Sequence, residues 1–415
     1  MASLPPLTPD PSPTRGEGST VPLTPDPSPT RGEGSNLPYL PFARPTLDED
    51  TIAGVAEVLR SGWITTGPQV RKFEAALSDY LGGRPARVLN SATAALEVAL
   101  QLCGIGLGDE VITPSQTFFA VPNMIAKVGA IPVFVDVDLL SRNLDFDAVE
   151  RAITPRTRAI MPTHFAGLPV DMNRLHEIAG RRGLRVIEDA ALAIGSSWRG
   201  RRVGSFGDLV VFSFHPNKNM TSIEGGALVL NDEAEAREVE TLRFHGITRL
   251  PDGTRDVAFP GGKFNLPDVN ARIGLGQLAR LEEFNARRRE LVAEYFRLFP
   301  ADPPCLLPHP GYSGDEAGHS WNLFAPLLPL DRLRIDRQQF RAALEARGIG
   351  TGVSYEAAHL TTLFRRRGHG DGELPNTERI ARETVTLPLF PAMTRADVER
   401  VCAAVGEVLA EAKIG

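Results

Sequence analysis

A single lysine, Lys218, stands in a polar segment between two apolar runs. The runs cover 209–212 and 227–230, and the segment between them contains SFHPNKNMTSIEGG. This pattern predicts a lysine held in a turn between two buried strands. Its amine can be an ordinary solvated charge, or it can form a Schiff base with a carbonyl compound, which requires a desolvated amine in a fixed position. Taken alone, the solvated charge is the simpler interpretation.

An acidic pair ends another apolar run. Glu188 and Asp189 follow Val186 and Ile187 in the segment VIEDAALAIGS. A carboxylate at this place can cap the next helix, or it can bind the protonated nitrogen of a pyridine ring and keep that ring cationic. Asp189 is therefore a candidate partner for a ring cofactor bound at Lys218.

Small and hydroxyl residues form a candidate phosphate site. The segment NSATAALEVAL, 90–100, places Ala92 and Thr93 at the start of a predicted helix. Unpaired backbone amides at a helix start attract anions, although helix capping by Ser91 or Thr93 is the alternative. Ser213, five residues before Lys218, can add a hydroxyl to the same site.

An aromatic residue, Phe118, follows another predicted strand in SQTFFAV. An aromatic ring there is more often part of the core than of a cofactor site. Nevertheless, a phosphate site, a carboxylate for the ring nitrogen, a stacking ring and a lysine are together the groups that pyridoxal 5'-phosphate requires. Their common placement after strands favours that cofactor over four unrelated structural roles.

The elements that must position these residues alternate regularly. We interpret seven apolar runs as strands: 87–89, 110–113, 131–136, 159–163, 185–188, 209–214 and 227–230. Most of them are separated by helical patterns, at 94–102, 121–128, 146–152 and 172–181. This alternation predicts an α/β fold with a mostly parallel sheet covered by helices on both faces. Ligands in such folds bind beyond the carboxyl ends of the strands, where all four features fall.

The remaining sequence suggests three parts. Residues 1–36 contain PLTPDPSPTRGEGS twice, at 6–19 and 22–35, and their composition predicts a disordered tail. Residues 37–289 would form the large domain, which a helical pattern at 48–60 opens. Residues 290–415 would form a smaller α+β domain, and the cleft between the two domains would take a substrate. The features behind the second boundary are a long helix from about 270 to 299, a strand in HSWNLFAPLL, and helices at 336–347 and 395–410.

Composition excludes several classes of function. The chain has 415 residues, a net charge of -6, 42% hydrophobic and 23% charged residues, with no basic tail that would indicate a nucleic-acid partner. No apolar stretch reaches the roughly 20 residues that span a bilayer, and the start lacks a signal-peptide pattern. The three cysteines lack metal-ligand spacing. We therefore expect a cytoplasmic protein without a metal site, whose partners are small molecules or protein chains.

From about Pro38 to the C-terminus, the sequence resembles the DegT/DnrJ/EryC1/StrS family of sugar aminotransferases, which are fold-type I pyridoxal phosphate enzymes. The motifs that carry the resemblance are SFHPNKN followed by EGG, IEDAA, the SAT segment, RFHG, KFNLPDVNA and TLPLFPAMT. Within the family, the chain most resembles the aminotransferases that form UDP-4-amino-4-deoxy-L-arabinose, through WITTGP, DEVITPS, KFNLPDVNA, GIGTG and AAH.

The resemblance implies a function and a set of roles. The enzyme would move an amino group from glutamate to a nucleotide-linked keto sugar, and glutamate would become 2-oxoglutarate. The acceptor would be a UDP-4-keto sugar, and the product would serve surface glycan or lipid A modification. Lys218 would bind the cofactor and shuttle protons, and Asp189 would pair with the pyridine nitrogen. Phe118 would stack on the ring, while Ala92, Thr93 and Ser213 would hold the phosphate.

The resemblance also implies a homodimer. Asn265, in KFNLPDVN, would reach the phosphate of the cofactor in the neighbouring protomer. Without the resemblance, an asparagine in this segment would be interpreted as a loop or helix-capping residue.

The sequence departs from the family at four positions. Leu192 stands where a histidine or glutamine usually lies near the phenolic oxygen of the cofactor, and leucine cannot hydrogen-bond that oxygen. Ser354, Glu356 and Asn322 replace residues that would lie near the sugar or co-substrate, so the departures bear on the choice of sugar.

The sequence bears on three alternative functions. A sugar dehydratase of the same fold has a histidine in place of the lysine, so Lys218 argues against it. A regulatory protein that keeps the fold without turnover is a second alternative, which Leu192 makes worth testing. A Rossmann dehydrogenase is excluded because no G-x-G-x-x-G follows the first strand.

Overall fold

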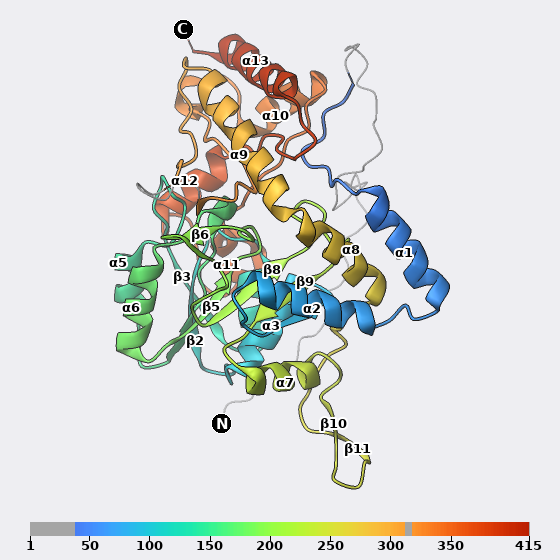
Figure 1. The fold of residues 1–415 in the computed structure, drawn as a ribbon. Coiled ribbons are helices and arrows are strands. Elements are labelled where there is room, and N and C mark those ends of the chain that lie inside the picture. The colour runs from blue at the N-terminus through green and yellow to red at the C-terminus, as the bar shows by residue number, and fades with distance from the viewer. Residues whose placement is uncertain (1–37, 312–317, 415) are drawn as a thin grey trace, which may run out of the picture. The chain divides into compact units, whose positions relative to one another are not determined.

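The computed structural model describes residues 38–311 and 318–414, so the predicted tail at 1–36 lies outside the described residues. A seven-stranded sheet forms its centre (Figure 1). Its strands are β1 (Ala86–Leu89), β2 (Glu110–Pro114), β3 (Ile131–Val135), β4 (Thr157–Ile160), β5 (Arg185–Asp189), β8 (Leu209–Ser213) and β9 (Gly226–Val229). All seven coincide with predicted strands, and every end lies within three residues of its prediction, because buried parallel strands consist of nearly continuous apolar runs.

The sheet is mostly parallel, as predicted. The strand order is β1-β9-β8-β5-β4-β2-β3, and β9 is antiparallel to both of its neighbours. The pairs β5–β8, β4–β5, β2–β4 and β2–β3 are parallel. The carboxyl ends of β2, β4, β5 and β8 therefore lie at one edge of the sheet, where ligands bind in this class of fold.

Helices cover both faces of the sheet (Figure 1). Three helices share one apolar cluster with side chains of one face: α3 (Ala92–Leu102), α4 (Ala120–Lys127) and α7 (Glu233–Leu242). Four others pack on side chains of the opposite face: α2 (Pro68–Tyr80), α8 (Asp268–Ala279), α5 (Phe146–Ala152) and α6 (Met172–Arg182). Alternate residues of each strand thus enter different cores, for example Val210 and Val211 of β8.

The helix predicted from about 270 to 299 is in fact two helices, α8 and α9 (Leu281–Leu298), which meet at Arg280. The helix α1 (Glu49–Ser61) is capped at both ends. The side chain of Asp48, its N-cap, accepts from the Thr51 amide, and Gly62, its C-cap, has the left-handed conformation. Among its apolar residues, Val58 is buried, but Ile52 and Leu59 are 47% and 56% exposed. Part of its apolar face therefore points away from the described core.

The C-terminal residues have their own apolar cluster. It combines Leu40 and residues of α9 with α10 (Arg337–Ala346) and α13 (Arg395–Ala412), and both later helices begin with a capping box. The strand predicted in HSWNLFAPLL is wrong: this segment is extended but makes only isolated bridges, such as Phe324 with Leu387. The short helices α11 (Thr362–Arg365) and α12 (Pro375–Glu383) complete this part.

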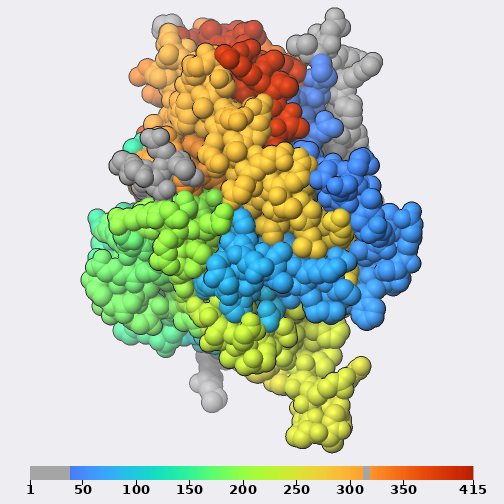
Figure 2. Space-filling view, in the orientation of Figure 1, coloured from blue at the N-terminus to red at the C-terminus, as the bar shows by residue number. Residues whose placement is uncertain are grey.

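Two small hairpins lie outside the central sheet. They are β6 (Ser197–Trp198) with β7 (Arg201–Arg202), and β10 (Ile247–Arg249) with β11 (Arg255–Val257). Figure 2 shows the second hairpin, in yellow, standing out from the surface. Across the two described ranges, no helix combines the length and apolar character needed to cross a membrane.

Candidate functional site

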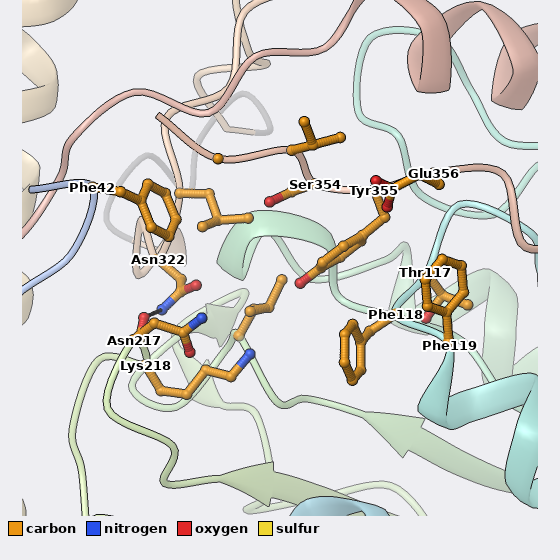
Figure 3. A pocket seen from close by; sticks show the side chains of 14 residues that line it. Phe42, Thr117, Phe118, Phe119, Asn217, Lys218, Asn322, Ser354, Tyr355 and Glu356 are labelled. Atoms are coloured by element: carbon orange, nitrogen blue, oxygen red, sulfur yellow. Dashed lines mark hydrogen bonds between the residues drawn. The ribbon is translucent and has the colours of Figure 1, made fainter. Parts of the chain in front are cut away.

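A cavity of about 200 Å³ lies over the carboxyl edge of the sheet. It joins the turn after β8, the segment after β2 and two segments from the C-terminal part (Figure 3). Its lining residues are Phe42, Thr117, Phe118, Phe119, Leu192, Asn217, Lys218, Asn322, Leu323, Gly352, Val353, Ser354, Tyr355 and Glu356. Of the residues predicted to bind the cofactor or act in catalysis, Lys218 and Phe118 line this cavity directly, and so do the four positions at which the sequence departs from the family: Leu192, Asn322, Ser354 and Glu356.

Lys218 has the electrostatic properties of a reactive amine. Its backbone amide donates to the His215 carbonyl at 2.9 Å, which holds the turn between β8 and β9. Burial lowers the pKa of the amine to about 8, and the charge of Asp189 opposes part of this shift. An amine with this pKa is about one-tenth neutral at pH 7, a far larger share than in a solvated lysine, and the neutral form is the nucleophile.

Asp189 lies at the end of β5, beside Lys218. Its Oδ1 accepts from the Ala191 amide at 3.1 Å, and its Oδ2 accepts from the Thr163 hydroxyl at 3.4 Å. The Thr163 hydroxyl in turn lies 2.7 Å from that of Thr117. Burial raises the pKa of Asp189, while the Ala191 amide and the charge of Lys218 act in the opposite direction. This carboxylate is thus held in place, and a cationic partner would favour its ionised form.

Tyr355 faces Lys218 across the cavity. Figure 3 shows the Tyr355 hydroxyl and the Lys218 amine pointing into the same space, with the Phe118 ring beside them. The ring centroid of Tyr355 is 5.9 Å from that of Phe118 and 6.2 Å from that of Phe165. Burial and the charge of Asp189 raise the pKa of Tyr355, so its hydroxyl stays protonated and available as a donor.

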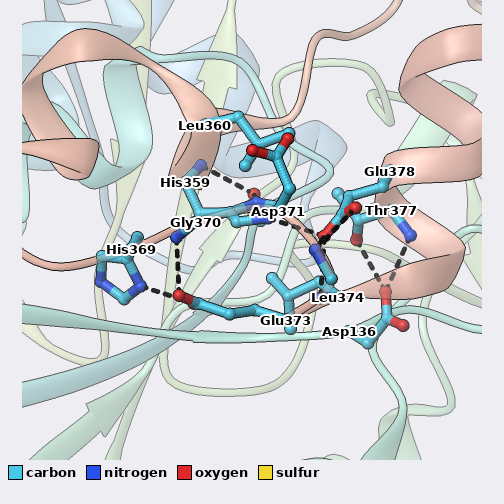
Figure 4. Close-up of polar contacts among 12 residues, drawn as sticks. Asp136, His359, Leu360, His369, Gly370, Asp371, Glu373, Leu374, Thr377 and Glu378 are labelled. Atoms are coloured by element: carbon cyan, nitrogen blue, oxygen red, sulfur yellow. Dashed lines mark hydrogen bonds and ion pairs between the residues drawn. The ribbon is translucent and has the colours of Figure 1, made fainter.

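A polar network fixes the segment that carries Tyr355. Gln116 donates to the Ser354 carbonyl at 3.3 Å, and the Ser115 hydroxyl lies 2.7 Å from Nδ1 of His359. Nε2 of His359 lies 3.3 Å from Glu378, which also accepts from the Gly372 amide (Figure 4). These contacts tie the 354–378 segment to the residues that follow β2.

The candidate phosphate residues gather at the start of α3. Ser91 caps this helix, since its hydroxyl accepts from the Ala94 amide at 3.1 Å, so the capping alternative describes Ser91. Ser213 pairs in register with Gly226, and a Cβ on Gly226 would lie only 2.4 Å from the Ala92 amide nitrogen. Glycine therefore lets Ser213 and the amide ends of Ala92 and Thr93 lie close together, where an anion could bind.

Asn265 lies apart from the Lys218 cavity. Its side chain donates to the Thr66 hydroxyl and accepts from the Lys263 amine, and its backbone forms a bridge with Leu89. It is not among the residues that line the cavity. In this chain, Asn265 is thus separate from the cavity residues, next to the end of β1.

Sequence reasoning missed several residues of the site. Tyr355 stands between Ser354 and Glu356, which were singled out, but no local pattern indicates that its ring reaches Phe118. Thr163 follows β4 at the same carboxyl edge as Asp189, and that placement was the available signal. Among the described residues, no group of His, Cys, Asp or Glu side chains could hold a metal ion.

The residues fit pyridoxal phosphate. Lys218 has a lowered pKa, Asp189 is a buried carboxylate that a pyridine nitrogen could neutralise, and the start of α3 presents backbone amides for the phosphate. When bound, pyridoxal phosphate supplies an electron sink that stabilises negative charge on a substrate carbon. None of the side chains named above can act as such an electron sink.

The chain is similar to several sugar aminotransferases of known structure. A putative sugar aminotransferase, Spr1654 from Streptococcus pneumoniae in its PMP form, is 31% identical, with a TM-score of 0.85 over 90% of this chain and 98% of that chain. DesV from S. venezuelae is 36% identical, with a TM-score of 0.81 over 90% and 99%. DesI, whose structure was determined in the presence of its TDP-sugar product, is 31% identical, with a TM-score of 0.80 over 90% and 93%.

The model of the DegT/DnrJ/EryC1/StrS aminotransferase family matches residues 45–406. The match covers the central sheet, the Lys218 turn and most of the C-terminal part, so it includes the whole cavity lining except Phe42. The chain therefore belongs to the DegT/DnrJ/EryC1/StrS aminotransferase family and is a sugar aminotransferase that depends on pyridoxal phosphate.

Proposed function

We propose that this enzyme transfers the amino group of glutamate to a nucleotide-linked keto sugar, and that a UDP-4-keto sugar is its acceptor. The observation that carries the proposal is the Lys218 amine, which has a pKa lowered to about 8 and faces Asp189 at the edge of the sheet. The TDP-sugar product of DesI supports a nucleotide-linked acceptor. The UDP nucleotide and the 4-keto position follow from the motifs shared with the arabinose-modifying enzymes, as does a role in surface glycan or lipid A modification.

Each residue has a proposed role. Lys218 would hold the cofactor through its amine, with loss of water, and once freed the amine would carry the proton to and from the substrate carbon. Asp189 keeps the pyridine nitrogen protonated, and the Thr163 hydroxyl orients this carboxylate. Phe118, which is 54% exposed in the open cavity, covers one face of the ring. Ala92, Thr93 and Ser213 bind the phosphate.

The proposed enzyme is a cytoplasmic homodimer. The exposed apolar residues Ile52 and Leu59 of α1 and the neighbouring Trp63 and Ile64 offer a surface that a second copy could cover. In that dimer, Asn265 would contribute to the phosphate site of the partner protomer, which accounts for its separation from the cavity of its own chain.

The test begins with the amino donor. Purified protein loaded with pyridoxal phosphate should show the absorption band of a lysine-bound cofactor, and glutamate should abolish it. A panel of UDP- and dTDP-linked 4-keto and 3-keto sugars should then restore it, with UDP-linked 4-keto sugars fastest. A 3-keto sugar or a dTDP sugar as the fastest acceptor would contradict the finer assignment only.

Substitution of the lysine tests the chemistry itself. Lys218→Ala should lower turnover by a factor on the order of 10³ or more, because no other amine lines the cavity among the described residues. Lys127→Ala is the control, since Lys127 is not among the residues that line the cavity and its amine pairs with Glu97 on α3. Full activity of Lys218→Ala would overturn the proposed function. Release of the sugar hydroxyl without amine transfer would favour a dehydratase instead.

A further inference from the structure

Asn322 presents an unused hydrogen-bond acceptor at the cavity. Its side chain is only 3% exposed and lines the cavity on the same side as Lys218 and Asn217 (Figure 3). The amide nitrogen donates to Oδ1 of Asn219 at 2.7 Å and to the Asn217 carbonyl at 3.2 Å. The amide oxygen, Oδ1, has no hydrogen-bond partner among the described residues. A buried acceptor without a donor is costly, so the site favours a ligand that brings one.

Neighbouring residues fix which end of the Asn322 amide faces the cavity. The Asn285 amide nitrogen donates to the Ile194 carbonyl at 3.2 Å, which leaves its oxygen to accept. The Asn219 nitrogen donates to that oxygen at 2.6 Å and to the Ser320 carbonyl at 2.8 Å. Reversal of Asn219 would place its oxygen against two other acceptors. The oxygen of Asn219 therefore faces Asn322 and must receive the Asn322 nitrogen.

The position of this acceptor points to the ligand group that it binds. The Asn322 amide nitrogen is hydrogen-bonded to the carbonyl of Asn217, the residue before Lys218, and both Asn322 and Lys218 line the cavity, so the Asn322 side chain lies beside the turn that carries the amine. We propose that Asn322 selects the sugar by accepting a hydrogen bond from the hydroxyl on the carbon next to the ketone. This inference rests on the proposed function, and it adds a specificity-determining residue and a required substrate hydroxyl.

The carboxylates of glutamate fit this acceptor poorly. The carboxylates of glutamate offer only acceptors at neutral pH, and both hydrogens of the Asn322 amide are already used. The Asn322 oxygen would therefore repel a carboxylate placed against it. A neutral ring hydroxyl supplies the missing donor without adding a charge.

The first experiment compares two substrates of the wild-type enzyme. A nucleotide-linked 4-keto sugar with a C3 hydroxyl should be aminated about tenfold to a hundredfold more efficiently, in kcat/KM, than its 3-deoxy analogue. A site that hydrogen-bonds a hydroxyl rejects an analogue that lacks it, because the protein acceptor is then left unpaired. Equal kcat/KM values for the two sugars would overturn the inference, and this comparison requires no variant.

The second experiment uses Asn322→Leu, which keeps the side-chain volume similar and removes the acceptor together with the two hydrogen bonds that the amide nitrogen donates, so the variant is judged by the ratio of the two sugars. The variant should lose about tenfold to a hundredfold in kcat/KM with the hydroxylated sugar and little with the deoxy sugar, so that it discriminates poorly. Asn173→Leu is the control, because Asn173 lies on α6 outside the cavity lining and its side-chain oxygen accepts a hydrogen bond from the Trp198 ring nitrogen. Retained discrimination in Asn322→Leu would also overturn the inference.

A separate measurement distinguishes this inference from the proposed function. Loss of the absorption band of the lysine-bound cofactor on addition of glutamate reports the donor half-reaction without any sugar. It should occur at a similar rate in the wild type and in Asn322→Leu. If the wild type does not respond to glutamate, the proposed function fails; if only Asn322→Leu fails to respond, Asn322 acts on the donor and the sugar assignment is wrong.

Discussion

Asp189 raises the pKa of the Lys218 amine, against the larger lowering that burial of the amine causes. The two residues lie at the ends of neighbouring parallel strands, since β5 ends at Asp189 and Lys218 lies in the turn that follows β8. The balance leaves the amine with a pKa of about 8, whereas a solvated lysine has a pKa near 10.4 and stays cationic at neutral pH. Burial thus prepares the amine for attack on a carbonyl group, and the carboxylate moderates that effect.

This balance predicts a pH dependence in the cofactor-free protein. Because the lowered pKa favours the neutral amine, labelling of Lys218 by an amine-selective reagent should rise with pH and reach half of its maximum near pH 8. Asp189→Asn removes a charge that raises this pKa, so its midpoint should move to lower pH. Peptide mass spectrometry across a pH series measures both midpoints. A midpoint near 10.4 in the wild type would contradict the burial of the amine.

Local sequence patterns predicted most of the sheet and its active edge. The strands are short apolar runs, and β-strands in a helix-covered parallel sheet have no polar face to obscure that pattern. The turn that contains Lys218 and the end of β5 at Asp189 could therefore be placed at one edge before any tertiary contact was known. The same reasoning could have included Thr163, which follows β4 at this edge.

Contacts between distant segments could not be predicted in the same way. Asn322 is 105 residues from the Asn217 carbonyl that it binds, and no periodic pattern encodes this pairing. The segment containing Asn322 is apolar enough to suggest a strand, yet it makes only isolated bridges because its neighbours are loops rather than strands. The outward direction of Ile52 likewise depends on which face of α1 meets α8, and a helical pattern alone does not determine that face.

Two tyrosines make a matched comparison of function and stability. Tyr355→Phe keeps the ring contacts with Phe118 and Phe165 but removes a hydroxyl that has no hydrogen-bond partner among the described residues. It should leave the melting temperature nearly unchanged and slow the sugar half-reaction about tenfold to a hundredfold, because the cavity loses a protonated donor. Stopped-flow absorbance of the cofactor measures the rate.

The control for that variant is Tyr295→Phe. The Tyr295 hydroxyl donates to the Pro388 carbonyl at 2.7 Å within the C-terminal core, away from the cavity. Its loss should lower the free energy of unfolding by about 1–3 kcal/mol, since it leaves a buried carbonyl unpaired, without changing either half-reaction. The role given to Tyr355 would be contradicted if Tyr355→Phe kept full activity and lowered the free energy of unfolding as much as Tyr295→Phe does.

The apolar face of α1 predicts self-association. If a second copy covers Ile52 and Leu59, then Ile52→Lys should weaken the dimer by at least tenfold in Kd, because it places a charge in an apolar interface. Sedimentation velocity over a range of protein concentrations measures the effect. Leu107→Lys, at an apolar residue that is 93% exposed and outside this face, should leave the association unchanged. Identical behaviour of all three proteins would place any dimer interface elsewhere.

Leu192 predicts an unusual cofactor spectrum. This buried side chain lines the cavity and packs with Phe165, Ala166 and Leu323, so it offers no hydrogen bond to a phenolic oxygen bound beside it. Leu192→Gln should supply that bond. It would stabilise the phenolate, which would then attract the proton on the nitrogen between Lys218 and the cofactor less strongly. The pKa of the lysine-bound cofactor should therefore fall, which an absorbance titration against pH measures.

The expected cost of that substitution provides its control. A glutamine amide placed in this apolar cluster should lower the free energy of unfolding by about 1–3 kcal/mol. Leu168→Gln introduces the same group at a similarly buried leucine that does not line the cavity, so it should be destabilising without altering the titration. If both variants shift the pKa equally, the shift reflects general loosening of the fold. If neither does, Leu192 does not lie beside the phenolic oxygen.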